Sequence, residues 1–276
     1  MKDLSNNNIL NDENDVFSSN EARKFIDIHC HCISGIDDGP STISESISLC
    51  KALADDNIAV VAATPHQLGR YDGMNDAQTV RDAVDKFNSI LKDLAIPLKI
   101  VSGGEIRADE RICQLIKDDK ILTIADGHKY ILIELPHQVF IDIEPLIQEL
   151  ISMDIYPIIS HAERVLTLTK NPDILSRWIE KFAYLQITAA SLLGDFGLEM
   201  ESASWNLLNS GLAHFVATDS HNINTRKPRM KDAYKNISSK LGEDFANMVC
   251  IDNPLRVMQG RDIVSKSVFD ESRMGV

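Results

Sequence analysis

Short apolar runs alternate along this chain with longer segments in which apolar residues recur every three or four positions. The runs that have the composition of buried strands are KFIDIHC, IAVVAATPH, LKIVSGGEI, KYILIELP, YPIISHAER, YLQITAAS and AHFVATDSH. Segments of helical period lie between most of them, at residues 42–56, 76–94, 143–153, 173–182 and 199–211. Strands that alternate with helices form a parallel sheet, and about seven such units predict a closed or nearly closed barrel. The expected fold class is therefore α/β.

The pattern also predicts where the folded part begins and ends. Residues 1–23 are rich in Asn, Ser, Asp and Glu and have few apolar side chains, which predicts a disordered N-terminal tail. Residues 24–260 contain no repeat and no linker rich in Pro, Gly or Ser, so we expect a single domain there and a C-terminal tail at 261–276. The chain has neither the apolar core of a signal peptide nor an apolar run of about 18 residues. A cytoplasmic protein that is not embedded in a membrane is expected.

Charge and cysteine content narrow the classes of function. The formal net charge is −13, which argues against a nonspecific nucleic-acid binder, because such proteins depend on clustered Lys and Arg. The five cysteines are scattered and odd in number, which suits a reducing compartment better than a disulfide framework. We expect the cysteines to be buried as small apolar residues and expect no nucleic-acid partner.

Polar side chains follow most of the predicted strands, at the end where an α/β barrel carries its chemistry. His29 lies near the end of the first run and His31 directly follows it, and side chains two residues apart on a strand point the same way. The candidate nitrogen and oxygen donors are His29, His31, Asp38, His66, Glu105, Glu134, His161, Asp219 and His221. Nine donors exceed the three or four protein ligands that one zinc ion needs, so two or three divalent cations are predicted. Imidazole and carboxylate without thiolate fit Mn²⁺, Fe²⁺ or Zn²⁺ and do not separate them.

Three other histidines are interpreted differently. His128 and His214 come before their strands, at the opposite end of the predicted barrel, and are expected to be structural or exposed. His137 follows Glu134 and Pro136 at the donor end. Two roles stay open for it, which are support of a metal ligand and contact with the substrate.

Several motifs together resemble a known family. They are DIHCHC…DDGP, ATPH, GGEI, LIELP, SHAER and ATDSHN…R.P.M..AY. The combination is similar to the polymerase and histidinol phosphatase (PHP) superfamily, and within it to bacterial protein-tyrosine phosphatases that partner capsule and exopolysaccharide tyrosine kinases. The resemblance runs from about residue 25 to NPLRVMQG near residue 260. It implies a distorted (β/α)7 TIM-like barrel, the PHP fold.

The resemblance also implies a trinuclear metal site. One ion would be held by His29, His31, Glu105 and Asp219. Glu105 would bridge to a second ion, which Glu134 and His161 complete. Asp38, His66 and His221 would hold the third. Mn²⁺ is the first expectation for these divalent ions, with Fe, Zn or Mg as alternatives.

Two arginines match phosphate-binding positions of the resembled family. They are Arg164 and Arg226, whose alternative role is a surface salt bridge. The implied activity is hydrolysis of phosphotyrosine on a protein, with a membrane tyrosine autokinase of capsule or exopolysaccharide synthesis as the substrate. Cys30 and Cys32 depart from the small or apolar residues expected there, and residues 1–23 extend beyond the usual start; neither departure touches the donor set.

Two other functions stay open. One is a histidinol-phosphate or other small-molecule phosphomonoesterase of the same superfamily, against which the DDGP turn and the position of Glu134 weigh by resemblance. The other is a noncatalytic metal-binding scaffold, against which the complete donor set weighs. No thiolate nucleophile is required for this activity, although Cys250 and Arg256 have the C-x5-R spacing of cysteine phosphatases.

Overall fold

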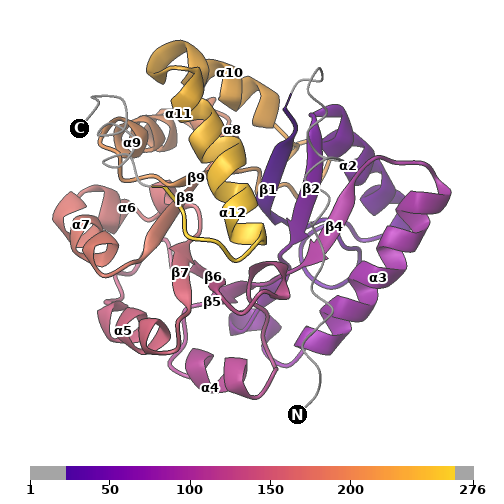
Figure 1. Ribbon diagram of the computed structural model, residues 1–276, viewed down its shortest axis with the longest axis horizontal. Helices are drawn as coiled ribbons and strands as arrows, with labels where there is room; N and C mark the ends of the chain where they lie inside the picture. Colours follow the sequence, from indigo (N-terminus) through magenta and orange to yellow (C-terminus); the bar gives the residue numbers. More distant parts are fainter. Residues whose placement is uncertain (1–22, 265–276) are drawn as a thin grey trace.

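The computed structural model describes residues 23–264 (Figure 1). Residues 1–22 of the predicted N-terminal tail and residues 265–276 of the predicted C-terminal tail lie outside the described residues. The strands within the described part are β1 (Phe25–Cys30), β2 (Ile58–Ala63), β3 (His66–Gln67), β4 (Lys99–Ser102), β5 (Glu105–Arg107), β6 (Tyr130–Glu134), β7 (Tyr156–Ile159), β8 (Tyr184–Thr188) and β9 (Phe215–Ala217). Every pairing between them is parallel, in the orders β1-β2-β4 and β3-β5-β6-β7-β8-β9.

Two of the seven predicted strands are interrupted, which accounts for the larger number of strands. Thr64 and Pro65 separate β2 from β3, and Gly103 and Gly104 separate β4 from β5. Proline has no N–H to donate to a strand ladder. A Cβ atom at Gly104 would lie 2.2 Å from Oε1 of Gln67, so a larger residue there would displace this buried side chain. At each interruption the chain leaves the first group of strands, which contains β2 and β4, and joins the second group, which contains β3 and β5.

The two groups of strands meet again at the opposite side, so that the parallel sheet curls on itself. Cys30 forms an isolated parallel bridge with Ser220, just beyond β9. The N–H of Asp219 donates to the carbonyl of His29 at 2.8 Å, and the N–H of His31 donates to the carbonyl of Ser220 at 2.9 Å. The ends of β1 and β9 are thereby held side by side.

Helices surround the curled sheet (Figure 1). The helices are α2 (Ile43–Asp55), α3 (Ala77–Asp93), α4 (Ile112–Lys117), α5 (Glu144–Ser152), α6 (Leu166–Thr169), α7 (Pro172–Glu180), α8 (Ala189–Leu192), α9 (Leu198–Asn209), α10 (Met230–Leu241), α11 (Glu243–Asn247) and α12 (Asn253–Met258). Short 3-10 turns, η1 (Gly69–Tyr71), η2 (Ile124–Asp126) and η3 (Ala162–Arg164), and a π turn, η4 (Met248–Asp252), complete the described part. The five helical segments predicted from periodicity are present as α2, α3, α5, α7 and α9. None of the helices in residues 23–264 is both long and apolar enough to cross a membrane.

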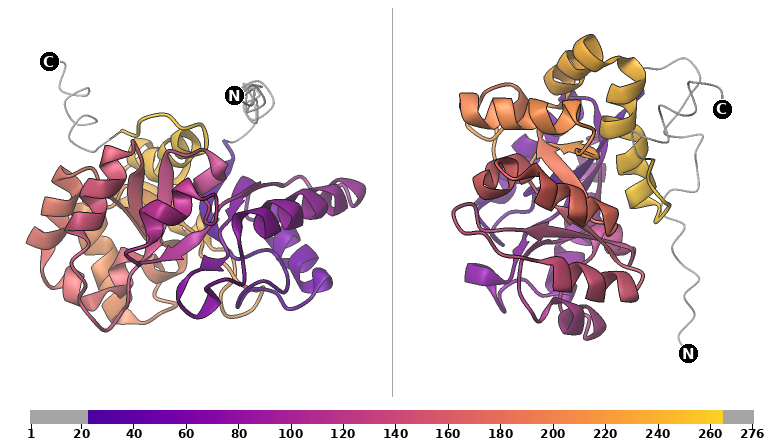
Figure 2. Two further views of the ribbon diagram at one scale, coloured as in Figure 1. Left: turned by 90° about the horizontal axis from the view of Figure 1, so that it is seen from below. Right: turned by 90° about the vertical axis from the view of Figure 1, so that its left-hand side faces the viewer.

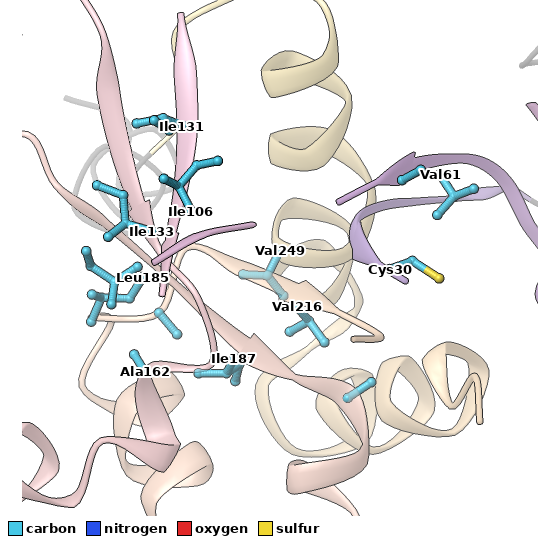
Figure 3. Packing of buried hydrophobic residues seen from close by; sticks show 14 of the residues in the cluster. Cys30, Val61, Ile106, Ile131, Ile133, Ala162, Leu185, Ile187, Val216 and Val249 are labelled. Atoms are coloured by element: carbon cyan, nitrogen blue, oxygen red, sulfur yellow. The ribbon is translucent and has the colours of Figure 1, made fainter. Parts of the chain in front are cut away.

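Apolar side chains fill two layers, one on each face of the sheet. In β6, Ile131 and Ile133 face the helices, whereas Tyr130 and Leu132 face the inside. Figure 3 shows part of the layer between strands and helices. The inner layer also receives Val257 and other side chains of α12, which runs along one side of the strands (Figure 2). The core therefore occupies both the outside of the sheet and one part of its interior.

The inward face of the strands changes from apolar to polar toward their carboxyl ends. Leu132 is followed two residues later by Glu134, and Ala217 by Asp219. Because side chains alternate along a strand, Glu134 continues the inward-facing row of β6. Asp219 lies two residues beyond the end of β9 and has a left-handed backbone conformation of its own. The chain thus delivers polar groups to the one end of the interior that the apolar core does not fill.

Candidate metal centre

His29 and His31 present the same ring nitrogen to the same pair of carboxylates. Their Nε2 atoms are 3.2 Å apart. Oε2 of Glu105 lies 3.3 Å from each of them, and Oδ1 of Asp219 lies 3.4 and 3.5 Å away. All four side chains are almost completely buried. Segments that are far apart in the sequence therefore place four donor atoms around one point.

Hydrogen bonds on the far side of each ring favour the tautomer that exposes a lone pair to this point. Nδ1 of His29 lies 3.0 Å from Oε1 of Gln186, and Nδ1 of His31 lies 2.6 Å from Oδ2 of Asp37. When Nδ1 donates to these oxygens, a neutral imidazole presents the unprotonated Nε2 to a metal.

The separations within this group fit a bound cation. A tetrahedral zinc site with bonds of about 2.0–2.1 Å has neighbouring ligand atoms about 3.3 Å apart. The nitrogen and oxygen atoms of the group lie 3.2–3.5 Å apart. Four acceptors at these distances would repel one another in a dry pocket, whereas a divalent cation would satisfy all of them. The donor set therefore fits a metal ion.

A second group lies on the other side of Glu105. Oε1 of Glu105 is 2.9 Å from Nε2 of His161, so the two oxygens of this carboxylate face different donor groups. Glu134, His137 and His161 each offer a donor atom within 4.8 Å of the others. His137 is exposed at the rim, and its ring centroid lies 5.1 Å from that of His161. Its sequence position left its role open, and the structure brings it beside two of the predicted donors.

A third group contains Asp38, His66 and His221. Oδ1 of Asp38 lies 3.3 Å from Nε2 of His66 and 3.4 Å from Nε2 of His221. His31 also lies within reach of these three side chains. Nδ1 of His66 is 3.1 Å from Oε2 of Glu105, which connects this group to the other two.

The structure thus brings all nine predicted donors into one cluster. Their role as metal ligands stays a prediction. His128 and His214 lie outside every donor group found in the described residues. His214 is buried directly before β9, where its Nδ1 accepts a hydrogen bond from the N–H of Leu185 at 3.2 Å.

Unusual backbone conformations turn two of these donors into the cluster. His161 and Asp219 have φ angles of 31° and 50°, in the left-handed region that non-glycine residues seldom occupy. Each follows the end of a strand, and each is held by a backbone hydrogen bond. The N–H of His161 donates to Oε1 of Gln186 at 2.9 Å, and the N–H of Asp219 donates to the carbonyl of His29. Strain of this kind is found at functional sites, where surrounding contacts maintain it.

Burial and neighbouring charges favour the metal-binding protonation state at four of the donors, whereas Glu105 and Asp37 outweigh burial and raise the pKa of His29 and of His31. Burial lowers the pKa of His161 and of His221 to about 4, so both rings are neutral near pH 7. Burial by itself raises the pKa of Glu105, but the nearby His29 and His161 outweigh it and hold that pKa well below its usual range. Burial likewise opposes ionisation of Asp219, but Arg164 and His29 hold its pKa well below the ordinary value. Neutral imidazoles and ionised carboxylates are the forms that coordinate cations.

Arg164 and Arg226 converge on the outer oxygen of Asp219. Nη2 of Arg164 lies 2.8 Å and Nη2 of Arg226 2.6 Å from Oδ2 of that carboxylate. The guanidinium of Arg164 also lies over the ring of Phe196, 4.3 Å from its centroid. The Nε–H group of each arginine is buried without a hydrogen-bond partner among the described residues. Two cations with unused buried donors therefore flank the donor cluster, as an anion-binding site requires.

Three residues that sequence reasoning missed hold the donors in place. Asp37 and Gln186 bind Nδ1 of His31 and His29, and the hydroxyl of Ser160 donates to Oε1 of Glu105 at 2.6 Å. Two of them left a signal in the sequence. Asp37 belongs to the acidic turn after the first strand, and Gln186 is a polar residue inside the apolar run YLQIT.

Comparison with known proteins agrees with this geometry. A family model described as capsular polysaccharide synthesis, CpsB/CapC, matches residues 25–259. The chain belongs to the CpsB/CapC family. The predicted resemblance is therefore confirmed.

Named relatives in this family are phosphatases. The chain is 36% identical over 226 residues to the tyrosine-protein phosphatase YwqE of Bacillus subtilis, which covers 81% of this chain and 88% of that protein. It is 38% identical over 213 residues to the putative tyrosine-protein phosphatase CapC of Staphylococcus aureus, covering 76% of this chain and 82% of that protein. A solved structure from work on YwqE of Bacillus subtilis and CpsB of Streptococcus pneumoniae, described as unique metal-dependent tyrosine phosphatases, superposes with a TM-score of 0.84. It has 33% sequence identity and covers 87% of this chain and 97% of that one.

Proposed function

We propose that this protein is a metal-dependent protein-tyrosine phosphatase. The observation that carries the proposal is the single cluster of nine predicted donors, flanked by two arginines with unused buried N–H groups. The named relatives support the same activity, because they are tyrosine-protein phosphatases at 36% and 38% identity. The donor cluster suits a hydrolase better than a scaffold, since a scaffold needs no buried anion site beside its metals.

The proposal assigns three divalent ions to the three donor groups. The first takes His29, His31, Glu105 and Asp219; the second takes Glu105, Glu134 and His161; the third takes Asp38, His66 and His221. Mn²⁺ is the proposed ion, with Fe, Zn or Mg as alternatives. When bound, divalent ions lower the pKa of water and neutralise charge on a phosphoryl group.

Arg164 and Arg226 are the proposed phosphate-binding residues. A guanidinium offers a planar fork of N–H donors that matches two phosphate oxygens. Both side chains are largely buried, with 13% and 27% exposure, so their charge acts in a medium of low dielectric. Fixed donors of this kind stabilise the negative charge on the nonbridging oxygens in the transition state.

The biological setting follows from the family. We infer that the substrate is phosphotyrosine on a membrane tyrosine autokinase, reached from the cytoplasm, in capsule or exopolysaccharide synthesis. The description of the family as capsular polysaccharide synthesis supports this setting. The proposed catalytic unit is residues 24–260, folded as a distorted (β/α)7 barrel of the PHP type. The curled parallel sheet supports that architecture.

Turnover of two phosphate esters, measured side by side, tests the proposed phosphatase function. A phosphotyrosine peptide and histidinol phosphate are assayed with added Mn²⁺ and after prolonged chelation. We expect hydrolysis of the peptide with metal, loss of activity on chelation, and recovery when metal returns. His66→Ala should lose activity, whereas the matched control His128→Asn, at the other end of the molecule, should keep it. Full activity in a sample shown by elemental analysis to be metal-free, or a preference for histidinol phosphate, overturns the proposal.

A further inference from the structure

A cavity of about 460 Å³ opens beside the donor cluster. Its lining includes three of the proposed ligands, Asp38, His66 and Glu134. The lining also includes three side chains of η1 and β5 that have no assigned role, Arg70, Tyr71 and Arg107. We call this space the Arg70–Arg107 pocket. A group bound at the metals would have this pocket as its neighbour.

The two arginines of the pocket differ from the pair proposed to bind phosphate. Arg164 and Arg226 both contact Asp219. In the pocket, Nη2 of Arg70 lies 3.3 Å from Oδ2 of Asp38, and Nη1 of Arg107 lies 3.2 Å from Oε2 of Glu134. The pocket therefore gathers a second pair of arginines, each of them beside a different carboxylate.

Specific packing holds this second region in place. Gly69 has a φ of 57°, and a Cβ atom there would lie 3.2 Å from Cγ of Arg107. The glycine therefore lets η1 pack directly on the stem of Arg107. Tyr71, the last residue of η1, stacks on the ring of His66 with the centroids 5.4 Å apart and the planes 8° apart. Its hydroxyl accepts a hydrogen bond from Arg70. The turn thus carries Arg70 to the same cavity as Arg107 and joins it to a proposed ligand.

Both guanidinium groups have N–H donors that the contacts described above do not use. Arginine has five N–H donors, and the contacts described above occupy one or two on each side chain. The side chains of Arg70 and Arg107 are 68% and 36% exposed, so an incoming group can reach them. In a chain of net charge −13, a pocket that holds two arginines attracts anions when bound cations offset the two carboxylates beside them.

We propose that the Arg70–Arg107 pocket binds acidic side chains next to the phosphotyrosine, so that the preferred substrate is an acidic phosphotyrosine segment. The inference rests on the proposed phosphatase function and adds a substrate class to it. Metal ions bound by Asp38 and Glu134 would offset those carboxylates, which leaves the two guanidinium groups available to a carboxylate of the substrate. The phosphate itself is left to Arg164 and Arg226.

Matched phosphopeptides test the proposal. One carries two Glu on each side of phosphotyrosine, and the other carries Gln at the same positions. With Mn²⁺-loaded wild-type protein we expect kcat/KM for the Glu peptide to exceed that for the Gln peptide by about fivefold, the size of a solvent-exposed ionic contact. The ratio should shrink at 0.3 M salt, because added ions screen exposed charges. It should fall close to one in the double variant Arg70→Ala/Arg107→Ala. The ratio is read within each variant, so a general loss of activity cancels.

The double variant Arg177→Ala/Lys235→Ala is the matched control. Arg177 of α7 and Lys235 of α10 are exposed, and their replacement removes two positive charges without touching the pocket. The control should keep the wild-type ratio. A ratio near one in the wild type, or an unchanged ratio in the double variant, overturns the inference and leaves the phosphatase proposal intact. A double variant that loses its metal and slows equally on both peptides while keeping the wild-type ratio also overturns it, because Arg107 then only orients Glu134. Failure of the wild type to hydrolyse either peptide overturns the phosphatase proposal and the inference together.

Discussion

Asp37 holds His31 through a hydrogen bond of 2.6 Å between Oδ2 and Nδ1, and this contact directs the opposite ring nitrogen at the donor cluster. The same carboxylate accepts from the N–H of His66 at 3.1 Å and from the N–H of Gly39 at 2.9 Å. Asp37 therefore fixes the side chain of one proposed ligand and the backbone of another. Partners of this kind keep an imidazole in the tautomer that binds metal.

Asp37→Asn should weaken metal binding without removing a ligand. The amide keeps the shape of the carboxylate but loses its charge, and its NH2 group would meet a backbone N–H donor. Loss of such a supporting contact typically costs about 10–100-fold in metal affinity or activity. Metal titration followed by elemental analysis measures the change. Asp56→Asn is the control, because Asp56 also accepts backbone N–H groups but does so at the start of α10. Equal metal affinity in wild type and Asp37→Asn would contradict the role given to Asp37.

Replacement of Arg164 or Arg226 by Ala should slow hydrolysis while the metals stay bound. Each variant removes a charge-assisted contact worth roughly 1.5–3 kcal/mol, which corresponds to a fall in kcat/KM of about ten- to a hundredfold. Lysine should restore only part of the rate, because a point charge cannot reproduce the planar fork. Steady-state kinetics and metal stoichiometry are measured together. Since both arginines contact Asp219, loss of metal would instead mean that they orient this ligand.

The cysteines should be dispensable for the chemistry. All five are buried and free, which confirms the expectation from their spacing. Burial raises the pKa of Cys113 to about 11 and also raises that of Cys250, so these thiols are protonated and unreactive near pH 7. Five single Cys→Ala variants should keep the wild-type kcat, with a lower melting temperature where a core contact is lost. A variant that keeps its fold and metal but loses turnover would point to a covalent mechanism.

His214 should make the fold less stable in mild acid. Burial lowers its pKa to about 4 in the folded protein, against about 6.5 in the unfolded chain. The unfolded state therefore binds the proton first as the pH falls. The contribution of His214 to the free energy of unfolding is complete above pH 6.5 and is lost progressively between pH 6.5 and 4. At pH 5 the loss is about 2 kcal/mol.

Urea unfolding at pH 8 and pH 5 measures this dependence. His214→Gln should lose less stability than the wild type between the two pH values. His128→Asn, which changes an exposed histidine in a turn, should keep the wild-type difference. An equal pH dependence in His214→Gln and wild type would show that other groups account for it.

Much of the candidate site could be predicted because its signals are local. The sequence states the type of each residue and shows where it stands relative to an apolar, strand-like run. Glu134 and Asp219 could therefore be assigned to strand ends without a structure. The alternation of strands and helices likewise predicted a parallel sheet and the five helices around it. The interruptions at Pro65 and Gly104 were not predicted, although proline and glycine are the residues that break strands. Their effect depends on which neighbouring strand each half then joins.

Only the tertiary structure decided which residues from distant segments of the chain contact one another. Gln186 lies 157 residues from His29 in the chain, yet it orients that ring and also binds the backbone of His161. Arg70 and Arg107 look like ordinary surface residues in the sequence, and they share one cavity in the fold, where Gly69 lets its turn pack closely on the stem of Arg107. Periodicity reports which face of its own element a residue occupies. The partner it meets across the fold is set by long-range packing, and no local pattern carries that information.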